Sequence, residues 1–149
     1  RLSRGDALMI KENDIAAMRM HGEGDAEALR RVVMSMDMDE HSDFTVFEVR
    51  EVNQALVVAS TWGHVQKMRG GADRVVILLD NMGPVGARQV NEVLSESGLR
   101  HRCVLEGSGG VDLDSLSKWN ESGVDIVSSS ALNRGVVPLD LSMLFEGGS

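Results

Sequence analysis

The stretch Arg74-Val75-Val76-Ile77-Leu78-Leu79-Asp80-Asn81 decides the fold of this chain. Its apolar run is almost unbroken and stops at an acid and a turn residue. A strand that is apolar on both faces is typical of a parallel sheet covered on both sides. The run therefore predicts a buried parallel strand, which needs similar strands before or after it in the chain.

The same pattern of an apolar run, a polar turn and a segment with helical spacing recurs along the chain. Further strands are predicted at residues 8–10, 44–49, 102–106 and 125–128. Helices are predicted over 15–34 with a break at 22–25, over 52–68, through 87–94 and over 113–119. Asp14 and Asp112 are predicted to cap the first and last of these helices. Residues 138–145 are expected to form a departing strand or a short closing segment.

Strands and helices that alternate in this way imply parallel strands joined by right-handed crossovers. This alternation alone fits either an open doubly wound sheet or part of a closed barrel, and the predicted fold class is α/β, with (βα) repeats that form part of an open or incomplete TIM-like α/β barrel. A complete eight-stranded barrel takes about 250 residues. A single domain over residues 1–149 is thus expected to be an incomplete circle, and something else must supply the remaining strands.

Composition argues against several classes of partner. The net charge is −8, with 23 acidic and 15 basic residues. Nonspecific nucleic-acid binding depends on Lys and Arg that neutralise phosphates, so no nucleic-acid partner is expected. No apolar run approaches the roughly 18 residues of a membrane span, so no membrane partner is expected either. The one cysteine, Cys103, is expected to be a buried small hydrophobe in a cytoplasmic protein.

Polar residues follow the predicted strands, and these positions are the candidates for a binding site. In a parallel α/β sheet the loops after the strands share one edge, where ligands bind. The residues at this edge are Lys11, Glu48, Asp80, Glu106, Ser108-Gly109-Gly110 and Ser128-Ser129-Ser130. One cation, three carboxylates and two turns of small residues are therefore expected to converge.

Each of these groups has a chemical use and a simpler structural alternative. Ser108-Gly109-Gly110 precedes a predicted helix, so its N–H groups are suited to a phosphate, although the glycines could simply turn the chain. The three carboxylates could hold sugar hydroxyls or a Mg²⁺ ion, or could cap the helices that follow them. Lys11 is a credible partner for a substrate anion, but it could also be a surface lysine. The four histidines do not cluster.

The same positions carry a resemblance to the quinolinate phosphoribosyltransferase family over essentially the whole chain. Residues 1–14, Arg-Leu-Ser-Arg-Gly-Asp-Ala-Leu-Met-Ile-Lys-Glu-Asn-Asp, resemble the family's Arg-x-x-Leu-x-Asp-x-x-Leu-Ile-Lys-Asp-Asn-His segment. Further matches follow in the family's order and spacing, at Val46-Phe47-Glu48-Val49, Leu78-Leu79-Asp80-Asn81-Met82, Leu105-Glu106-Gly107-Ser108-Gly109-Gly110, Gly123-Val124-Asp125 and Leu139-Asp140-Leu141-Ser142.

The resemblance implies a reaction, a cofactor and partners. The reaction is transfer of the phosphoribosyl group of phosphoribosyl pyrophosphate to quinolinate, with decarboxylation to nicotinate mononucleotide and Mg²⁺ as cofactor. The chain resembles the C-terminal barrel domain of this family. The family's N-terminal domain is absent from the sequence, so a missing domain or partner chain and a homo-oligomer, dimer or higher, are expected.

The resemblance also implies roles for individual residues. Lys11, Glu48 and Asp80 would be the catalytic residues. Glu48 and Asp80 would contact ribose hydroxyls and the metal, in part through water. The full substrate-binding set would be Arg1, Lys11, Glu48, Asp80, Glu106, Ser108, Gly109, Gly110, Ser130 and Arg134.

Several positions depart from the family pattern, Arg4 and Phe47 among them, and three others bear on whether activity is retained. Asp14 stands where the family has a histidine, Ser130 replaces a glycine, and Arg134 replaces another histidine. These substitutions leave two alternatives to the transferase, a noncatalytic scaffold or assembly subunit derived from the family, and another barrel enzyme that binds a sugar phosphate.

Overall fold

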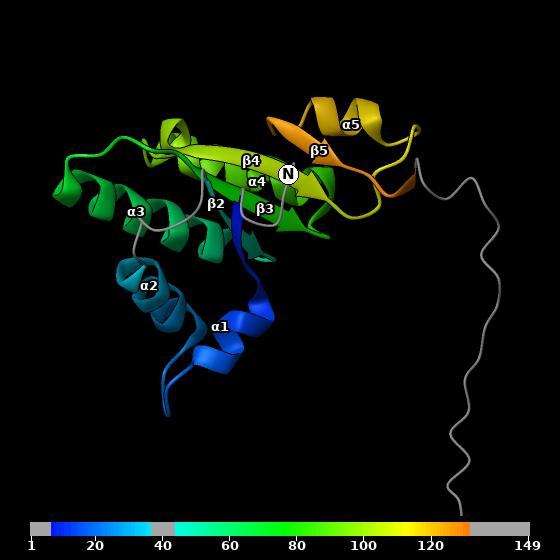
Figure 1. Ribbon diagram of the computed structural model, residues 1–149. Helices are drawn as coiled ribbons and strands as arrows, with labels where there is room; N and C mark the ends of the chain where they lie inside the picture. The colour runs from blue at the N-terminus through cyan, green and yellow to red at the C-terminus, as the bar shows by residue number, and fades with distance from the viewer. Residues whose placement is uncertain (1–6, 37–43, 132–149) are drawn as a thin grey trace, which may run out of the picture.

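A computed structural model of the chain describes residues 7–36 and 44–131. In it, one sheet of five parallel strands runs through the molecule in the order β1-β2-β3-β4-β5 (Figure 1). The strands are β1 (Ala7–Ile10), β2 (Phe44–Val49), β3 (Val75–Asp80), β4 (Cys103–Ser108) and β5 (Ile126–Ser128). Every strand predicted from the apolar runs in this part of the chain is present.

The helices connect these strands in the expected alternation. They are α1 (Glu12–Met18), α2 (Asp25–Ser35), α3 (Val52–Arg69), α4 (Gly83–Glu96) and α5 (Leu116–Asn120), with a short 3₁₀ turn, η1 (Arg100–Arg102), before β4. α3 ends at Gly70, whose φ of 72° lies in the left-handed region that glycine adopts at helix C-termini. The connection between β1 and β2 contains two helices, α1 and α2, as the predicted break at residues 22–25 implied.

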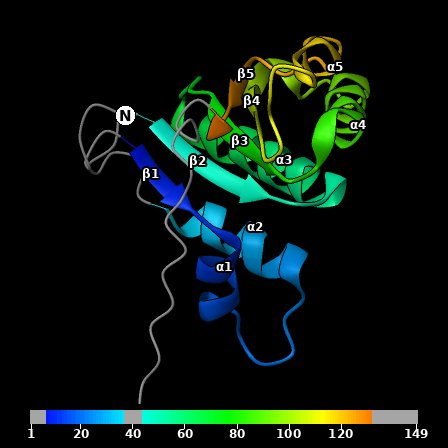
Figure 2. The same cartoon turned by 90° about the vertical axis from the view of Figure 1, so that its right-hand side faces the viewer.

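The strand order settles which kind of parallel sheet this is. Each strand pairs with the next one in the chain, from Ala7 beside Phe44 to Ser108 beside Ser128. A doubly wound sheet instead reverses its strand order in the middle and places helices on both faces. Here α2 contacts α3, α3 contacts α4 and α4 contacts α5, so the helices form one layer (Figure 2). The described sheet is consequently an arc of a TIM-like barrel, which confirms the predicted fold class.

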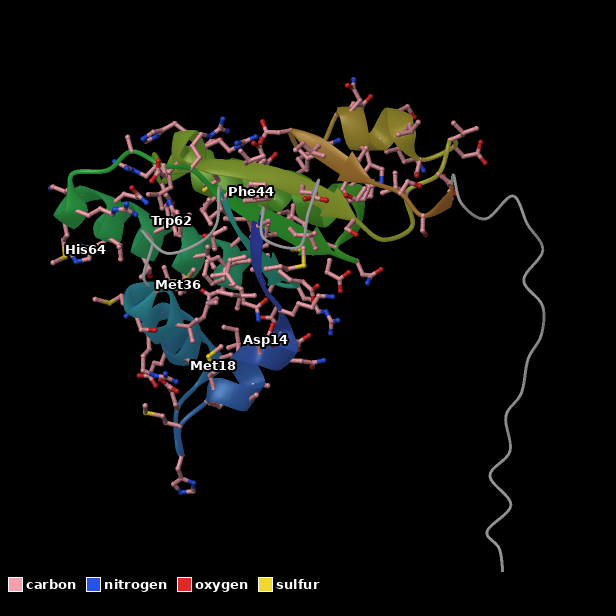
Figure 3. The ribbon with its side chains drawn as sticks, in the orientation of Figure 1. Asp14, Met18, Met36, Phe44, Trp62 and His64 are labelled. Carbon is pink, nitrogen blue, oxygen red and sulfur yellow. The ribbon has the colours of Figure 1, made fainter. Side chains whose placement is uncertain are left out.

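The two faces of the sheet differ. The larger core lies between the strands and the helix layer and includes the fully buried Phe47, Ile77 and Leu105. Trp62 of α3 belongs to this core and donates its indole N–H to the carbonyl oxygen of Asp73 at 2.7 Å (Figure 3). The opposite face carries only a small apolar cluster around Val46 and Leu78. This second face corresponds to the inside of a barrel.

Cys103 is fully buried at the start of β4, as expected of a small hydrophobe. Burial raises the pKa of its thiol to about 11. A thiol with so high a pKa is mostly protonated near neutral pH and is a poor nucleophile. Cys103 is therefore a packing residue.

Both predicted helix caps are wrong in their details. Asp14 lies inside α1, three residues after Lys11, and its carboxylate accepts the N–H of Lys11 at 2.8 Å (Figure 3). Asp112 accepts the N–H of Ser115 at 2.8 Å and so caps a turn, while α5 begins only at Leu116. Leu113, which was expected within a longer helix, is 84% exposed. With its side chain in solvent, Leu113 gives a longer helix no apolar contact in this turn.

Residues 138–145, predicted as a closing segment, lie outside the described residues. Within the described ranges no helix is long and apolar enough to cross a membrane.

Candidate functional site

The strand register brings the predicted site residues to one edge of the sheet. Glu48 of β2 lies opposite Leu78, and Leu78 lies opposite Glu106 of β4. Lys11 follows Ile10, the partner of Phe47, and so continues this row beside Glu48. One step toward the strand ends, Asp80, Ser108 and Ser128 are aligned across β3, β4 and β5. In-register side chains of a parallel sheet point to the same face, here the inner one.

Lys11 and Glu48 form the first pair of this edge. The Lys11 ammonium nitrogen is 4.0 Å from Oε2 of Glu48, and the two side chains are 58% and 14% exposed. At this separation the groups attract each other without a short hydrogen bond. The exposed Lys11 ammonium is therefore only loosely held and remains available to a ligand, and its departure would leave the Glu48 carboxylate without this partner.

Arg50 is a residue at this edge that the sequence did not single out. Its Nε donates to Oδ2 of Asp80 at 3.0 Å, and its Nη1 forms an ion pair with Glu12 at the start of α1. The pKa of Arg50 is raised, first by its hydrogen bond with Asp80 and then by the charge of Glu12. Its position two residues after Glu48 was the available signal, because residues i and i+2 of a strand share a face.

Asp80 is held from two sides. While Oδ2 accepts from Arg50, Oδ1 accepts from the side-chain amide of Asn81 at 2.9 Å. The N–H of Asn81 in turn donates to the carbonyl oxygen of Ser108 at 2.9 Å. Asn81 has a φ of 54°, a left-handed conformation that asparagine tolerates better than most residues. This turn fixes the end of β3 against the end of β4.

A cavity of about 560 Å³ opens beyond β3, β4 and β5. Its lining consists of Asn81, Ser108, Gly109, Gly110, Val111, Asp112, Ser128, Ser129, Ser130 and Ala131. Four predicted residues, Ser108, Gly109, Gly110 and Ser130, therefore border one space. Lys11, Glu48, Asp80 and Glu106 lie at the same edge of the sheet but do not line this cavity.

Glycine is required at the mouth of this cavity. Gly109 has a φ of 90°, and a Cβ built on it would lie 2.2 Å from Oδ1 of Asn81. Gly110 also has a positive φ, 64°, but a Cβ there would meet open space. The turn therefore brings bare backbone to the cavity, as a phosphate-binding turn needs.

The expected help from a helix dipole at this turn is absent. The sequence predicted a helix directly after Ser108-Gly109-Gly110, but α5 starts at Leu116 and has five residues. The residues between form a turn held by Asp112 and Ser115. Any anion in the cavity would therefore meet the N–H groups of the turn rather than the end of a long helix.

The charge around the cavity is negative. Among its described lining residues Asp112 carries the only full charge. Hydrogen bonds from Ser115 lower the pKa of Asp112, so this carboxylate stays ionised at neutral pH. Glu106 lies behind the cavity and accepts the hydroxyl of Ser128. A phosphate bound here would need a cation from another part of the edge or from a metal ion.

The described residues fit a Mg²⁺ ion only in one mode. No group of three or more His, Cys, Asp or Glu side chains within 7–36 and 44–131 is arranged to hold a metal. Glu48 and Asp80 offer at most two carboxylates. Mg²⁺ commonly keeps several waters and binds through one or two carboxylates together with substrate phosphates. The edge therefore suits an ion that arrives with a phosphorylated ligand.

Some predicted residues fall elsewhere. Arg1 and Arg134 lie outside the described residues. His21, His64 and His101 are exposed and lie away from this edge, as expected, and His41 is outside the described part of the chain.

Comparison with known proteins shows which family the sequence of this chain matches. Residues 1–144 match the family model described as "Quinolinate phosphoribosyl transferase, C-terminal domain". The chain is 34% identical over 143 residues to a probable nicotinate-nucleotide pyrophosphorylase [carboxylating] of Methanothermobacter thermautotrophicus, covering 95% of this chain and 44% of that protein. It is 30% identical over 151 residues to the chloroplastic nicotinate-nucleotide pyrophosphorylase [carboxylating] of Arabidopsis thaliana, covering 98% of this chain and 40% of that protein.

Solved structures agree on the fold. A NadC deletion mutant superposes with a TM-score of 0.61 at 24% identity, over 91% of this chain and 40% of that one. Nicotinate-nucleotide pyrophosphorylase from Ehrlichia chaffeensis gives a TM-score of 0.54 at 21% identity, over 85% of this chain and 38% of that one. The chain thus spans less than half the length of the relatives it matches.

Proposed function

The chain belongs to the quinolinate phosphoribosyltransferase family through that family's C-terminal domain, and we propose that it forms the sugar-phosphate-binding edge of such an enzyme. In the proposed reaction the bond between C1 of the ribose and pyrophosphate breaks, and a bond forms from C1 to the nitrogen of quinolinate. The 2-carboxylate of the ring then leaves as CO₂ and a proton takes its place. The products are nicotinate mononucleotide, pyrophosphate and CO₂.

One observation carries this proposal: a row of carboxylates lies at the same sheet edge as a cavity lined by small residues. Glu48 and Glu106 share the row of Lys11, and Asp80 is aligned with Ser108 at the cavity. A ribose that loses pyrophosphate develops positive charge, which carboxylates placed beforehand stabilise. A turn with exposed N–H groups suits the phosphate on the other end of the same sugar.

The residues of this edge would divide the substrate between them. We assign Glu48 and Asp80 to the ribose hydroxyls, and Lys11 to an anionic group of quinolinate. Ser108, Gly109, Gly110 and Ser130 would hold the sugar phosphate. Arg1 and Arg134 enter the proposal through their positions in the family pattern.

A Mg²⁺ ion, when bound, would neutralise pyrophosphate oxygens and so help this group to leave. Glu48 and Asp80 are the residues that would hold it, directly or through water. The chain's own contribution is to fix these two carboxylates on neighbouring strands.

The rest of the protein belongs to the proposal too. Because the curated relatives are more than twice as long as this chain, we propose that an N-terminal domain or a second chain completes the quinolinate pocket. We extend the proposal to a homo-oligomer of dimer size or larger and to a cytoplasmic location.

Titration of the complete protein tests this function. Calorimetry with phosphoribosyl pyrophosphate and Mg²⁺ should give saturable heat, and quinolinate should then release pyrophosphate and nicotinate mononucleotide. The absence of saturable heat at millimolar ligand would contradict this proposal. It would also contradict the alternative that the chain belongs to another barrel enzyme that binds a sugar phosphate. Binding without turnover, in protein with all its parts supplied, would instead favour the noncatalytic alternative.

A further inference from the structure

Arg50 follows β2 at the edge of the sheet that carries the candidate site, and it forms two ion pairs there. Both partners are carboxylates from other elements. One is Asp80 at the end of β3, 3.0 Å from the guanidinium Nε, and the other is Glu12 at the start of α1. The Arg50 side chain is 53% exposed, whereas that of Asp80 is 18% exposed. The guanidinium thus lies half in solvent, whereas the carboxylate that it pairs with is mostly shielded.

The two carboxylates assigned to the metal differ in how closely other side chains engage them. Glu48 faces the Lys11 ammonium at 4.0 Å, beyond hydrogen-bonding distance. Asp80 has one oxygen hydrogen-bonded to Arg50 and the other to Asn81. A divalent ion near Asp80 would also meet the fixed positive charge of Arg50, which repels it at short range. The guanidinium and the metal therefore compete for the same carboxylate.

We propose that Arg50 is a positioning residue that keeps Asp80 in an ion pair, so that a divalent cation gains Asp80 only by displacing this guanidinium. Glu12 provides the displaced guanidinium with a second carboxylate at the same edge. An anionic ligand such as pyrophosphate would serve the same purpose, because it offers Arg50 new acceptors. Metal and pyrophosphate binding are then coupled through one side chain. This inference rests on the proposed function for the presence of a divalent ion.

Mn²⁺, used as a substitute for Mg²⁺, allows a test without turnover. Electron paramagnetic resonance of free Mn²⁺ measures its dissociation constant for the complete protein and for the variant Arg50→Gln. We expect the variant to bind Mn²⁺ about tenfold more tightly, because a repelling charge a few ångströms away is removed. Adding Asp80→Asn to this variant should abolish the gain. Equal or weaker Mn²⁺ binding by Arg50→Gln would overturn the proposal.

Two further variants separate charge from fold. Arg50→Lys keeps a positive charge near Asp80, so its Mn²⁺ affinity should stay close to that of the unmodified protein. Arg88→Gln is the matched control, since it removes an arginine from a surface ion pair with Glu121, at 3.6 Å, on other elements. A gain in Arg88→Gln as large as that in Arg50→Gln would show that only net charge matters, and would also overturn the proposal.

A third measurement reads the coupling directly. Inorganic pyrophosphate should tighten Mn²⁺ binding by a larger factor in the unmodified protein than in Arg50→Gln, whereas a merely structural Arg50 would leave this factor unchanged. If Arg50→Gln does not fold, Glu12→Gln replaces it, and removing the second acceptor should weaken Mn²⁺ binding about threefold. Unchanged or tighter binding in Glu12→Gln would count against the proposal. Failure of the proposed reaction would appear separately, as absent nicotinate mononucleotide formation despite these Mn²⁺ results.

Discussion

The two ends of the sheet use the same kinds of charged residue in opposite ways. At the end where the strands begin, Arg100 donates to the carbonyl oxygens of Cys103 and Gly123 and to the carboxylate of Asp125. Asp125 also accepts the N–H of Leu105 at 2.8 Å. At the end where the strands finish, the partners of the Lys11 and Arg50 side chains within residues 7–36 and 44–131 are carboxylates of other side chains.

The two ends differ in the partners of their charged side chains, which include backbone groups at the first end and are other side chains at the second. A backbone group in a strand keeps its place, so a charge bonded to it is fixed and supports the fold. An exposed cation that is paired only with side chains, as Lys11 and Arg50 are here, can turn away and leave its partner to a ligand at little cost. The first end therefore stabilises the sheet, and the second end is suited to binding.

Replacing one carboxylate at each end of the sheet should give the largest effects. The replacement at the binding end should lower activity, and the replacement at the other end should lower stability. Asp80→Asn should lower kcat/KM of the proposed reaction by at least about 100-fold, because transition-state charge loses a prepared partner. Its melting temperature should change little, because the asparagine oxygen can still accept from Arg50, whose side chain is half-exposed. Asp125→Ala should instead lower the free energy of unfolding by about 1–3 kcal/mol, since it leaves the Leu105 N–H without its side-chain acceptor and removes one of the acceptors of Arg100.

Steady-state kinetics and urea unfolding of both variants measure these effects. If Asp80→Asn were the less stable variant, or Asp125→Ala the less active one well below its melting temperature, the division between the two ends would be wrong.

Lys11→Ala tests the binding end with a single cation. We expect the affinity for quinolinate to fall about tenfold or more, the size of a lost charge-assisted hydrogen bond, with a smaller change for phosphoribosyl pyrophosphate. Stability should change by less than about 0.5 kcal/mol, because the Lys11 side chain is exposed and its nitrogen lies 4.0 Å from the Glu48 carboxylate. Calorimetry with each ligand measures the two affinities. An equal loss for both ligands would show that Lys11 does not distinguish them.

Gly109→Ala and Gly110→Ala form a matched pair at the cavity. Both residues have positive φ, so either alanine should cost about 1 kcal/mol of stability. Only at Gly109 would the new Cβ collide with Asn81, at 2.2 Å. Gly109→Ala should therefore lose more stability and more affinity for phosphoribosyl pyrophosphate than Gly110→Ala. Thermal melting and calorimetry compare the two, and identical behaviour would exclude this contact as the reason for the glycine.

The smallest expected effect concerns Glu23, which lies in the loop between α1 and α2. Its carboxylate accepts two hydrogen bonds from Arg31 of α2. Arg31 also donates to the carbonyl oxygen of Met18. Like Arg100 at the start of the strands, Arg31 is therefore bonded to the backbone as well as to a carboxylate. The hydrogen bond from Arg31, followed by that from the Met20 N–H, holds the pKa of Glu23 at about 2.

A lowered carboxyl pKa adds stability above the unfolded pKa, near 4.3, and this contribution is lost as pH falls toward 2. The melting temperature of Glu23→Gln should therefore lie below that of the unmodified protein at pH 7, and the two should converge near pH 2. Glu121→Gln is the control, because its exposed pair with Arg88 is longer, at 3.6 Å. A difference that persists at pH 2 would contradict this account.

Much of the site could be predicted because it depends on where strands end. Apolar runs located the ends of β2 and β3, and these ends placed Glu48 and Asp80 at one edge. The glycine turn after β4 was found in the same way, and the structure confirms that Ser108, Gly109, Gly110 and Ser130 border one cavity. The roles of these residues stay predictions.

The errors arose where local pattern competes with distant contacts. The sequence from Asp112 to Trp119 has a cap and apolar spacing, yet Leu113 is exposed and α5 starts late. Asp14 has the chemistry of a cap but lies within α1, because the helix begins directly after the strand that ends at Ile10. The position of Arg50 beside Glu48 could have been read from the sequence, but its pairing with Asp80 could not, because the two residues are 30 positions apart.

By itself, the sequence determined the alternation of strands and helices, the face that each strand residue shares with its second neighbour, and the residues at each strand end. These features follow from hydrophobic periodicity over a few residues, which needs no knowledge of the neighbours in space. Only the tertiary structure decided that the strands follow one another in chain order as an arc of a barrel, and that Arg50 pairs with Asp80. Strand order and side-chain pairing depend on contacts between distant residues, and no local pattern records them.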